Sequence, residues 1–512
     1  MGIIARQSIK GTIVTYIGVA VGFLTTFFVL TRFLTSEEIG LARVLVDAAT
    51  LFIGLAQLGT NSSIIRFYPY FKDSDTRDHG FFFWTLVVPL FGFLLFAAVY
   101  WACHVPLGNW FGEKSPLFMD YYYMVLPLAF FMLYQTIFET NANVLMRIVV
   151  PRTVRELVVR LGMLALYLLY AFRVLSMDGF VIGLCLNYAL AALINLAYLF
   201  AYGHISLRPD RAFLRQNPAL VRSYLLYTAF LFVSAVAGVL APALSSFFIT
   251  AKMGLDHTGI YAIATYIAVM VSIPYRSVTA IASPQLARAI KEQNREETSH
   301  LIHQVSNNLL LVGGLIFLAI WFNIDLIFHI LPNGSTYAVA KNVVLILGIN
   351  QIVIATLSIC LSALSYSRFY IFSLFLSFFL TITSILLNNC LIPVYGMDGA
   401  ALSNLIAYAA YFALALLVLR LTCRVSVANR KTFLSILLIA VLFALNALWE
   451  HFLPVANIWL SSILRSAVLL GSGIAIAWAL RLSPELNSLV VTCILKIRKN
   501  YGNDTATTRQ RD

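Results

Sequence analysis

The chain has 512 residues, of which 61% are hydrophobic, 14% aromatic and only 11% charged. A soluble chain of this length would form several domains with polar surfaces, and about 25% of its residues would be charged. These numbers exclude a soluble enzyme, a disordered chain and a secreted disulfide scaffold. The apolar residues form unbroken runs of about 20, not the alternating pattern of membrane strands, so we predict an all-α polytopic membrane protein.

A membrane-spanning helix needs about 20 mostly apolar residues, and the sequence predicts fourteen of them. In chain order they lie near 11–31, 41–64, 81–103, 121–145, 157–172, 180–203, 223–250, 259–282, 301–322, 341–364, 370–391, 400–419, 433–450 and 460–480. The first is predicted to be a retained span, because no small-residue cleavage site follows it.

Lysine and arginine predict the orientation, because they are enriched in cytoplasmic loops. With a cytoplasmic N-terminus, 26 basic residues fall in the cytoplasmic loops and tail, against 4 on the opposite side. Five more lie within or at the ends of spans: Arg43, Arg160, Arg276, Lys341 and Arg465. Both termini are therefore predicted to be cytoplasmic. The net charge of +13 reflects orientation, and we expect no nucleic-acid partner.

An internal repeat predicts the domain organisation. The segment Met177–Gly179 matches Met397–Gly399 at an offset of 220, and Ile39–Leu41 corresponds in kind to Thr258–Ile260 at an offset of 219. Chance similarity between apolar segments is the alternative. Two parallel six-span lobes related by an axis along the membrane normal are predicted, with two added spans. The predicted parts are an N-terminal lobe at 1–203, a cytoplasmic inter-lobe loop at 204–222, a C-terminal lobe at 223–419, two extra spans at 433–480 and a cytoplasmic tail at 481–512. From Pro484 the tail is predicted either as a helix on the inner leaflet or as a loosely ordered segment.

Polar side chains inside the spans are the candidate functional residues, because they are costly in a membrane unless they face protein or water. The second predicted span places six residues at steps of three and four, hence on one helix face: Arg43, Asp47, Thr50, Gly54, Gln57 and Asn61. The eighth span adds Arg276 and the fourth adds Glu139. These faces predict a hydrated lumen, with Arg276, Arg43, Asp47, Gln57, Asn61 and Glu139 as its candidate substrate-headgroup residues.

Each candidate also has a purely structural interpretation. Arg276 lies near the cytoplasmic end of its span and fits snorkelling to the interface. Arg43 and Asp47 equally fit a structural ion pair. Glu139 fits a packing pair with Arg160, while Arg160 and Arg465 lie near span ends, where snorkelling is the expected behaviour.

Catalytic chemistry is not indicated by the sequence. There is no Walker A motif and no nucleophile–base constellation, and the H-x-x-H at His300 and His303 lacks an acidic or cysteine partner. We therefore expect a protein that is not an enzyme, with no catalytic residue, metal site or cofactor.

The predicted 6+6+2 arrangement, the Met-Asp-Gly segments and the stretch from Glu37 to Pro69 resemble a known group of transporters. The chain is similar to the multidrug/oligosaccharidyl-lipid/polysaccharide exporter superfamily, and most of all to its Wzx-type polysaccharide flippases. The resemblance implies a MATE-like fold and alternating access through a cationic lumen. Its implied substrate is an undecaprenyl-pyrophosphate-linked oligosaccharide repeat unit for O-antigen, capsule or exopolysaccharide, moved from the cytoplasmic to the outer leaflet of the bacterial inner membrane. In that family, cavity arginines are thought to meet the anionic headgroup, and Arg276 and Arg43 are the corresponding candidates.

Several alternatives stay open at this stage. A lipid II flippase and a cation-coupled multidrug exporter belong to the same superfamily, although the first and seventh predicted spans contain no Asp or Glu. A membrane-embedded polymerase or glycosyltransferase would need a larger outer loop. The energy source for transport is either the membrane potential or coupling to H⁺ or Na⁺. Further implied partners are membrane lipid and the polysaccharide polymerase machinery.

Overall fold

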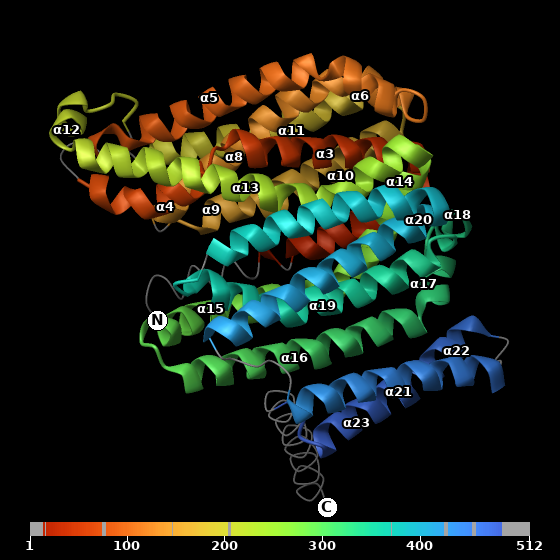
Figure 1. Ribbon diagram of the computed structural model, residues 1–512. Coiled ribbons are helices and arrows are strands. Elements are labelled where there is room, and N and C mark those ends of the chain that lie inside the picture. The colour runs from red at the N-terminus through yellow and green to blue at the C-terminus, as the bar shows by residue number, and fades with distance from the viewer. Residues whose placement is uncertain are drawn as a thin grey trace, which may run out of the picture. The chain divides into compact units, whose positions relative to one another are not determined.

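The computed structural model of the chain describes residues 14–15, 17–73, 78–145, 147–202, 206–369, 371–423, 429–452 and 457–483. Every regular element in these ranges is helical (Figure 1). Most of the predicted tail, including the segment from Pro484, lies outside the described residues.

The helices have the following bounds. They are η1 Thr25–Leu30, α2 Thr31–Phe33, α3 Ser36–Ala56, α4 Thr60–Phe71, η2 Asp78–Gly80, α5 Phe81–Ala102, α6 His104–Phe111, α7 Pro116–Asp120, η3 Tyr122–Met124, α8 Val125–Val144, α9 Val149–Thr153, η4 Val154–Val158, α10 Val159–Ala171, α11 Met177–Tyr202, α12 Arg211–Gln216, α13 Pro218–Met253, α14 Leu255–Val269, η5 Met270–Ser272, α15 Ile273–Lys291, α16 Arg295–Phe322, α17 Ile324–Ile330, α18 Gly334–Ala338, α19 Lys341–Tyr366, α20 Ile371–Cys423, α21 Arg430–Phe452, α22 Ile458–Arg465, η6 Ser466–Leu470 and α23 Gly471–Ala479.

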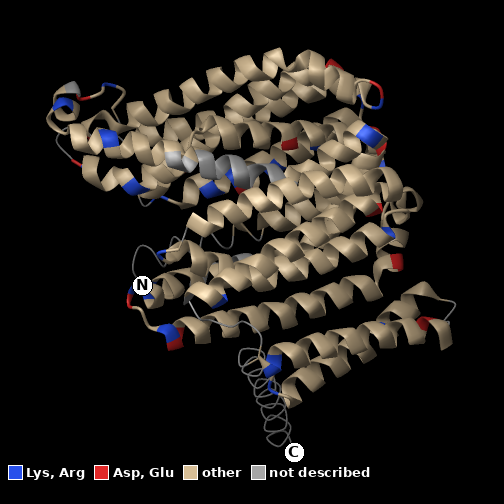
Figure 2. Ribbon diagram, viewed as in Figure 1, with Lys and Arg blue, Asp and Glu red and all other residues tan. Residues whose placement is uncertain are grey.

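Within the described part of the chain, nine helices are long and apolar enough to cross a membrane. They are Ser36–Ala56, Asp78–Ala102, Met177–Ala201, Leu255–Tyr275, Arg295–Phe322, Lys341–Tyr366, Ile371–Thr422, Arg430–Phe452 and Ile458–Ala479. Charged residues gather toward the helix ends, and long central stretches of the helices carry none (Figure 2). The protein is thus an all-helical, multi-pass membrane protein.

The run Ile371–Thr422 covers two predicted spans, because Gly396 has non-helical dihedral angles and separates two helices within it. Shorter apolar helices occur at Ile17–Phe33 and Ala243–Met253, where the first and seventh spans are predicted. Helices α8 and α10 lie at the predicted fourth and fifth spans.

The chain forms two compact units. Unit 1 comprises Met1–Ile263, Leu331–Ala340 and Ser377–Ser403, and unit 2 comprises Ala264–Ile330, Lys341–Leu376 and Asn404–Asp512.

Helix α3 is the central element of unit 1 and packs against α5, α8 and α13. Its N-terminus carries a capping box, in which the Thr35 hydroxyl accepts from the Glu38 amide and the Glu38 carboxylate accepts from the Thr35 amide. These bonds satisfy two amides that the first helical turn leaves unpaired. Leu41 and Leu45 are fully buried beneath the cap, so packing and capping fix the same helix start.

The second predicted span is not one continuous helix, and this corrects the prediction for 41–64. Helix α3 ends at Ala56, and α4 begins at Thr60. Between them Leu58 and Gly59 have φ values of 48° and 73°. Glycine adopts the left-handed conformation without steric cost. This conformation interrupts the hydrogen bonds of the α-helix, so the helix ends here. The six polar residues of the sequence pattern therefore do not share one helix face, because Asn61 belongs to α4.

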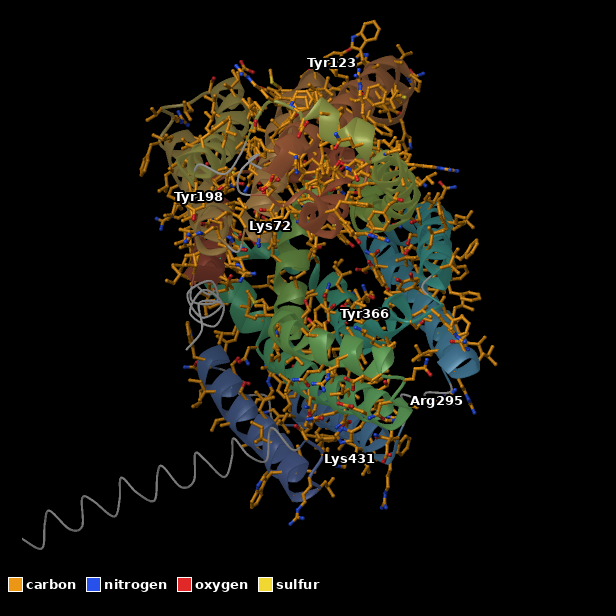
Figure 3. All side chains as sticks on the ribbon, turned by 90° about the vertical axis from the view of Figure 1, so that its left-hand side faces the viewer. Lys72, Tyr123, Tyr198, Arg295, Tyr366 and Lys431 are labelled. Atoms are coloured by element: carbon orange, nitrogen blue, oxygen red, sulfur yellow. The ribbon has the colours of Figure 1, made fainter. Side chains whose placement is uncertain are left out.

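Unit 2 is built on α16, which packs against α15, α19 and α21. A buried apolar cluster joins them to the C-terminal helices: Val271, Leu311, Phe317, Leu318, Phe322, Leu438, Leu442, Leu469, Ala477 and Leu482. Arg295 at the start of α16 and Lys431 at the start of α21 lie at the same end of this unit (Figure 3). The two helices therefore run in the same direction, as the three spans between them (one in α19 and two in α20) require.

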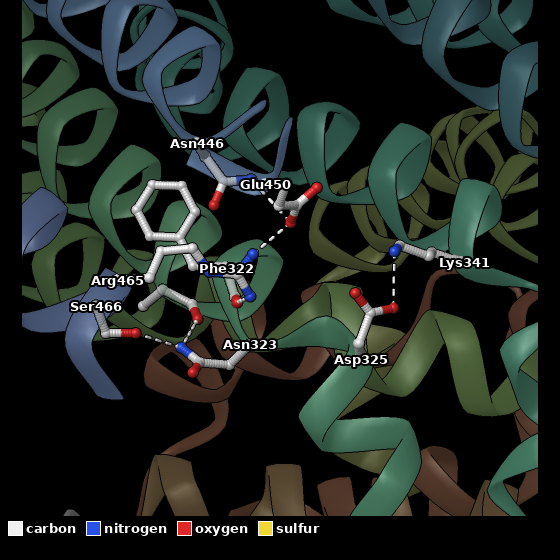
Figure 4. A network of polar contacts seen from close by, with 9 residues as sticks. Phe322, Asn323, Asp325, Lys341, Asn446, Glu450, Arg465 and Ser466 are labelled. Carbon is white, nitrogen blue, oxygen red and sulfur yellow. Dashed lines mark hydrogen bonds and ion pairs between the residues drawn. The ribbon is translucent and has the colours of Figure 1, made fainter. Parts of the chain in front are cut away.

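Arg465 does not snorkel, which corrects the expectation for this residue. Its side chain is buried, and its guanidinium donates to the Glu450 carboxylate and to the Phe322 carbonyl (Figure 4). Next to it, the Asn323 amide donates to the Ser466 hydroxyl at 2.8 Å. These bonds fasten the end of α16 to α21 and α22. Near the middle of α16, the Asn307 amide donates to the Leu482 carbonyl at 2.6 Å.

Replacing Arg465 by alanine is expected to loosen the C-terminal helices. The change removes charge-assisted hydrogen bonds from the interior and should lower the free energy of unfolding by ~2 kcal/mol. Thermal unfolding of the detergent-purified protein measures this. Arg288→Ala is the control, because Arg288 and its partner Glu292 are both exposed. Equal melting temperatures for the two variants would contradict the anchoring role.

A second anchor joins two loops of unit 1. His79 Nδ1 lies 2.9 Å from Asp210 Oδ2, and the imidazole stacks on Phe213 with 3.9 Å between ring centroids. Asp210 also caps α12 by accepting from the Phe213 amide. The hydrogen bonds from His79 and from the Phe213 amide hold the pKa of Asp210 below its usual value.

A depressed carboxyl pKa contributes stability that is present above the unfolded-state pKa and is lost as pH falls through the folded-state value. Relative to the intrinsic rate at each pH, the amides of residues 206–217 should therefore exchange slowly near pH 6 and faster below about pH 4. Asp210→Asn should give fast exchange at both pH values, as hydrogen-exchange mass spectrometry can measure. Slow exchange in this variant near pH 6 would rule out the anchor.

Candidate functional site

Five of the six predicted site residues lie in unit 1. Arg43 and Asp47 are on α3, Gln57 caps its C-terminus, Asn61 is on α4 and Glu139 is on α8. The sixth, Arg276, lies on α15 in unit 2, and its side chain is outside the described part of the structure.

Arg43 and Asp47 form an ion pair one turn apart on α3. Arg43 Nε lies 2.8 Å from Asp47 Oδ2, and their side chains are 24% and 13% exposed. The pair neutralises both charges within the helix, which lowers the cost of holding them at this depth. Since both side chains keep some exposure, the guanidinium is accessible to a ligand that offers a better acceptor.

Gln57 and Asn61 bridge the break between α3 and α4. The Asn61 amide donates to the Gln57 side-chain oxygen at 2.8 Å, and the Asn61 oxygen accepts from the Thr140 hydroxyl of α8 at 3.2 Å. Both helices therefore connect to α8 at the point where the backbone ladder is interrupted. These hydrogen bonds hold the two helices together, which explains why the amide side chains of Gln57 and Asn61 occur in an apolar segment.

Glu139 pairs with Arg155, not with Arg160. Its carboxylate lies 2.8 Å from the Arg155 guanidinium, and Glu139 is 12% exposed while Arg155 is 46% exposed. Arg155 also lies 3.4 Å from Glu156. The expected pairing between the fourth and fifth spans thus exists, but with a different arginine.

Arg160 joins the adjacent helix, so the snorkelling expectation for it is also wrong. Its guanidinium donates to Glu156 at 2.9 Å and to the Gly18 carbonyl at 2.6 Å. The segment between Arg155 and Arg160 includes the π-helix η4, whose extra residue per turn alters the side-chain directions that α-helical spacing predicts. Arg155 and Arg160 stand five residues apart, and this spacing does not show which of them reaches Glu139 on α8.

These contacts form one polar seam, defined by Gln57, Asn61, Thr140, Glu139, Arg155, Glu156 and Arg160. It runs from α3 and α4 across α8 to η4 and α10, and ends at the Gly18 carbonyl. Its two carboxylates balance its two guanidinium groups. A ligand that binds its arginines must therefore displace a carboxylate. The seam does not present an unpaired cationic surface.

Sequence reasoning missed Arg155 and Glu156 as members of this seam. Arg155 was counted with the cytoplasmic loop residues because the fifth span was placed from residue 157 onward. The available signal was the spacing of Glu156 and Arg160, which stand four apart and form a helical ion pair.

The sequence profile of the polysaccharide biosynthesis protein family matches residues 5–288. This match covers more than half of the chain. The chain belongs to the polysaccharide biosynthesis protein family. It is a membrane transporter family, and the protein is not an enzyme. Among curated proteins, no sequence matches this chain.

Solved structures show which fold the family member adopts. The chain is similar to a lipid II flippase, MurJ, in an inward closed conformation, with a TM-score of 0.71, 12% identity, and coverage of 92% of this chain and 99% of that one. It is also similar to an inward-facing multidrug resistance MATE transporter, with a TM-score of 0.61, 13% identity, and coverage of 79% and 94%. The Vibrio cholerae MATE transporter VcmN in its bent form matches with a TM-score of 0.51 and 16% identity, and the match covers 82% of this chain and 99% of that one. The fold is therefore MurJ- and MATE-like.

The Glu139–Arg155 contact is tested by a double-mutant cycle. Arg155→Ala should destabilise the purified protein by ~2 kcal/mol, because the buried Glu139 side chain loses its ion partner. Adding Glu139→Gln should recover part of the loss, with a coupling free energy of ~0.5–3 kcal/mol. The matched cycle of Glu139→Gln with Arg160→Ala should show weaker coupling, and the reverse order of coupling would refute the observed pairing.

Proposed function

We propose that the protein is a flippase for undecaprenyl-pyrophosphate-linked oligosaccharide repeat units of O-antigen, capsule or exopolysaccharide. The family match carries this proposal, and the whole-length similarity to a lipid II flippase supports a lipid-linked cargo. Such a cargo has a polar, anionic head that needs a hydrated path and an apolar tail that stays in lipid.

Arginine is the suitable residue for the headgroup, because its planar guanidinium makes paired hydrogen bonds to phosphate oxygens. Arg276 and Arg43 are the proposed headgroup contacts, with Asp47, Gln57, Asn61 and Glu139 as further lumen candidates. Arg43 is paired with Asp47, so binding there exchanges a carboxylate for a phosphate. The released carboxylate then repels the anionic cargo, which limits the affinity and allows the headgroup to leave.

The proposed architecture has fourteen spans, arranged as two six-helix lobes at 1–203 and 223–419 plus two spans at 433–480. Both termini lie in the cytoplasm, and the membrane is the bacterial inner membrane. The parallel course of α16 and α21 is consistent with the three spans proposed between them. The membrane potential favours outward movement of an anionic head by about 2.3 kcal/mol per charge per 100 mV, and H⁺ or Na⁺ coupling is the other proposed drive. Polysaccharide polymerase machinery is the proposed downstream partner.

A lipid II flippase is the second candidate, favoured by the similarity to MurJ. A cation-coupled multidrug exporter is the third, favoured by the MATE-like fold. The three differ in what accumulates when the protein is absent: a lipid-linked repeat unit, lipid II, or a cationic drug.

Deletion of the gene distinguishes these candidates. We expect repeat units on the cytoplasmic face and at least a tenfold loss of surface polysaccharide, because the charged head cannot cross lipid unaided. Wild type should restore the polymer, whereas Arg276→Ala should not, and Arg43→Ala should restore it incompletely. Exposed Arg288 provides the control, since Arg288→Ala should behave as wild type. Normal surface polysaccharide in the deletion strain would disprove the proposal.

A further inference from the structure

Helices α3 and α14 touch backbone to backbone at their first turns. A Cβ atom added to Gly40 would lie 2.0 Å from the Leu255 carbonyl oxygen, and one added to Gly259 would lie 1.9 Å from the Ser36 carbonyl oxygen. Both distances are far below van der Waals contact, so only glycine fits at either position. All four residues belong to unit 1.

The contact is reciprocal in sequence as well as in space. Ser36 and Leu255 stand 219 residues apart, and so do Gly40 and Gly259. Gly40 contacts Leu255, which is the repeat equivalent of Ser36, and Gly259 contacts Ser36 itself. The two contacts are therefore the same contact with the repeats exchanged. A self-complementary contact of this kind is the signature of a two-fold axis passing between the two segments. The axis of the predicted repeat thus passes between Gly40 and Gly259.

Hydrogen bonds surround this axial contact. The Ser36 hydroxyl donates to Asp256 at 2.7 Å, the Asn333 amide donates to the Thr31 carbonyl at 2.8 Å, and the Ser115 hydroxyl donates to the Thr250 carbonyl at 2.7 Å. Each bond joins the first repeat to the second. In the predicted orientation all of them lie at the outer ends of spans or in outer loops.

Such a contact is well suited to open and close. Backbone atoms make the closest approach, and the polar groups beside it can exchange each other for water when the helices separate. At the predicted cytoplasmic ends of the second and seventh spans, the hydroxyls of Ser63 on α4 and Thr228 on α13 lie 2.9 Å apart. The two predicted repeats therefore contact each other at both predicted ends of the spans.

We propose that Gly40, Gly259 and the Ser36–Asp256 bond form the outer gate of the transport path. The two glycines let the helix ends close fully, and separation of α3 from α14 releases the headgroup to the outer leaflet. This inference rests on the proposed function for the direction of transport. The contact itself does not depend on the cargo.

A reversible cross-link tests whether the contact must open. Ser36→Cys with Asp256→Cys, in a chain whose native cysteines are replaced, should form a disulfide under oxidation. Surface polysaccharide export should fall at least tenfold and recover after reduction. Thr85→Cys with Asn141→Cys is the matched control, because that pair lies 3.2 Å apart within the first repeat. Full export with the gate pair cross-linked would identify a static contact and overturn the proposal.

A substrate-independent measurement separates failure of the gate from failure of the proposed function. Gly40→Ala should hold the outer side open and raise labelling of Thr50→Cys by an outside, membrane-impermeant maleimide at least threefold. Gly471→Ala is the control, because no atom lies within 4 Å of a Cβ added there. Unchanged labelling in a Gly40→Ala protein that purifies and melts like wild type would overturn the gate. Increased labelling with no polysaccharide defect in the deletion strain would support the gate and refute the proposed cargo.

Discussion

The absence of water in the hydrocarbon interior is the constraint on which this structure depends. A backbone group without a partner costs several kcal/mol there, so a crossing segment must satisfy its own hydrogen bonds, and helices do so. The same penalty applies to charged side chains. Arg43, Arg155, Arg160 and Arg465 each have a carboxylate partner, and Arg160 and Arg465 also bond backbone carbonyls.

These pairings change how the candidate site is understood. A lumen of bare arginines would bind an anionic headgroup tightly and release it slowly. In the polar seam each guanidinium already has a carboxylate partner, so any anionic ligand would have to exchange with that partner. Arg155 is the most exposed seam arginine, with 46% of its side chain accessible, and it is held by two carboxylates. A transporter needs such modest affinity, because its cargo must leave as readily as it enters.

The interruptions of helical geometry lie where these polar contacts occur. The break at Leu58 and Gly59 separates Gln57 from Asn61, and the two amides restore a link across it. The π-helix η4 carries Glu156, and the π-helix η6 follows directly after Arg465. Irregular backbone frees polar groups that need partners, and polar side chains supply them. The irregular backbone and the polar contacts therefore occur together. In a regular α-helix at these positions the charged side chains would point in other directions.

The sequence by itself determined that the protein is a helical, multi-pass membrane protein, because apolar runs of spanning length admit no other backbone solution. It also indicated the family and the intramembrane residues that require an explanation. Only the tertiary structure decided which partners those residues have. It placed Arg155 against Glu139, buried Arg465, and moved Asn61 onto a separate helix. The reason is geometric: hydrophobic periodicity assumes regular helices, whereas a left-handed residue or a π-turn rotates every side chain beyond it. Spacing finds the charged residues, but only packing decides which of them meet.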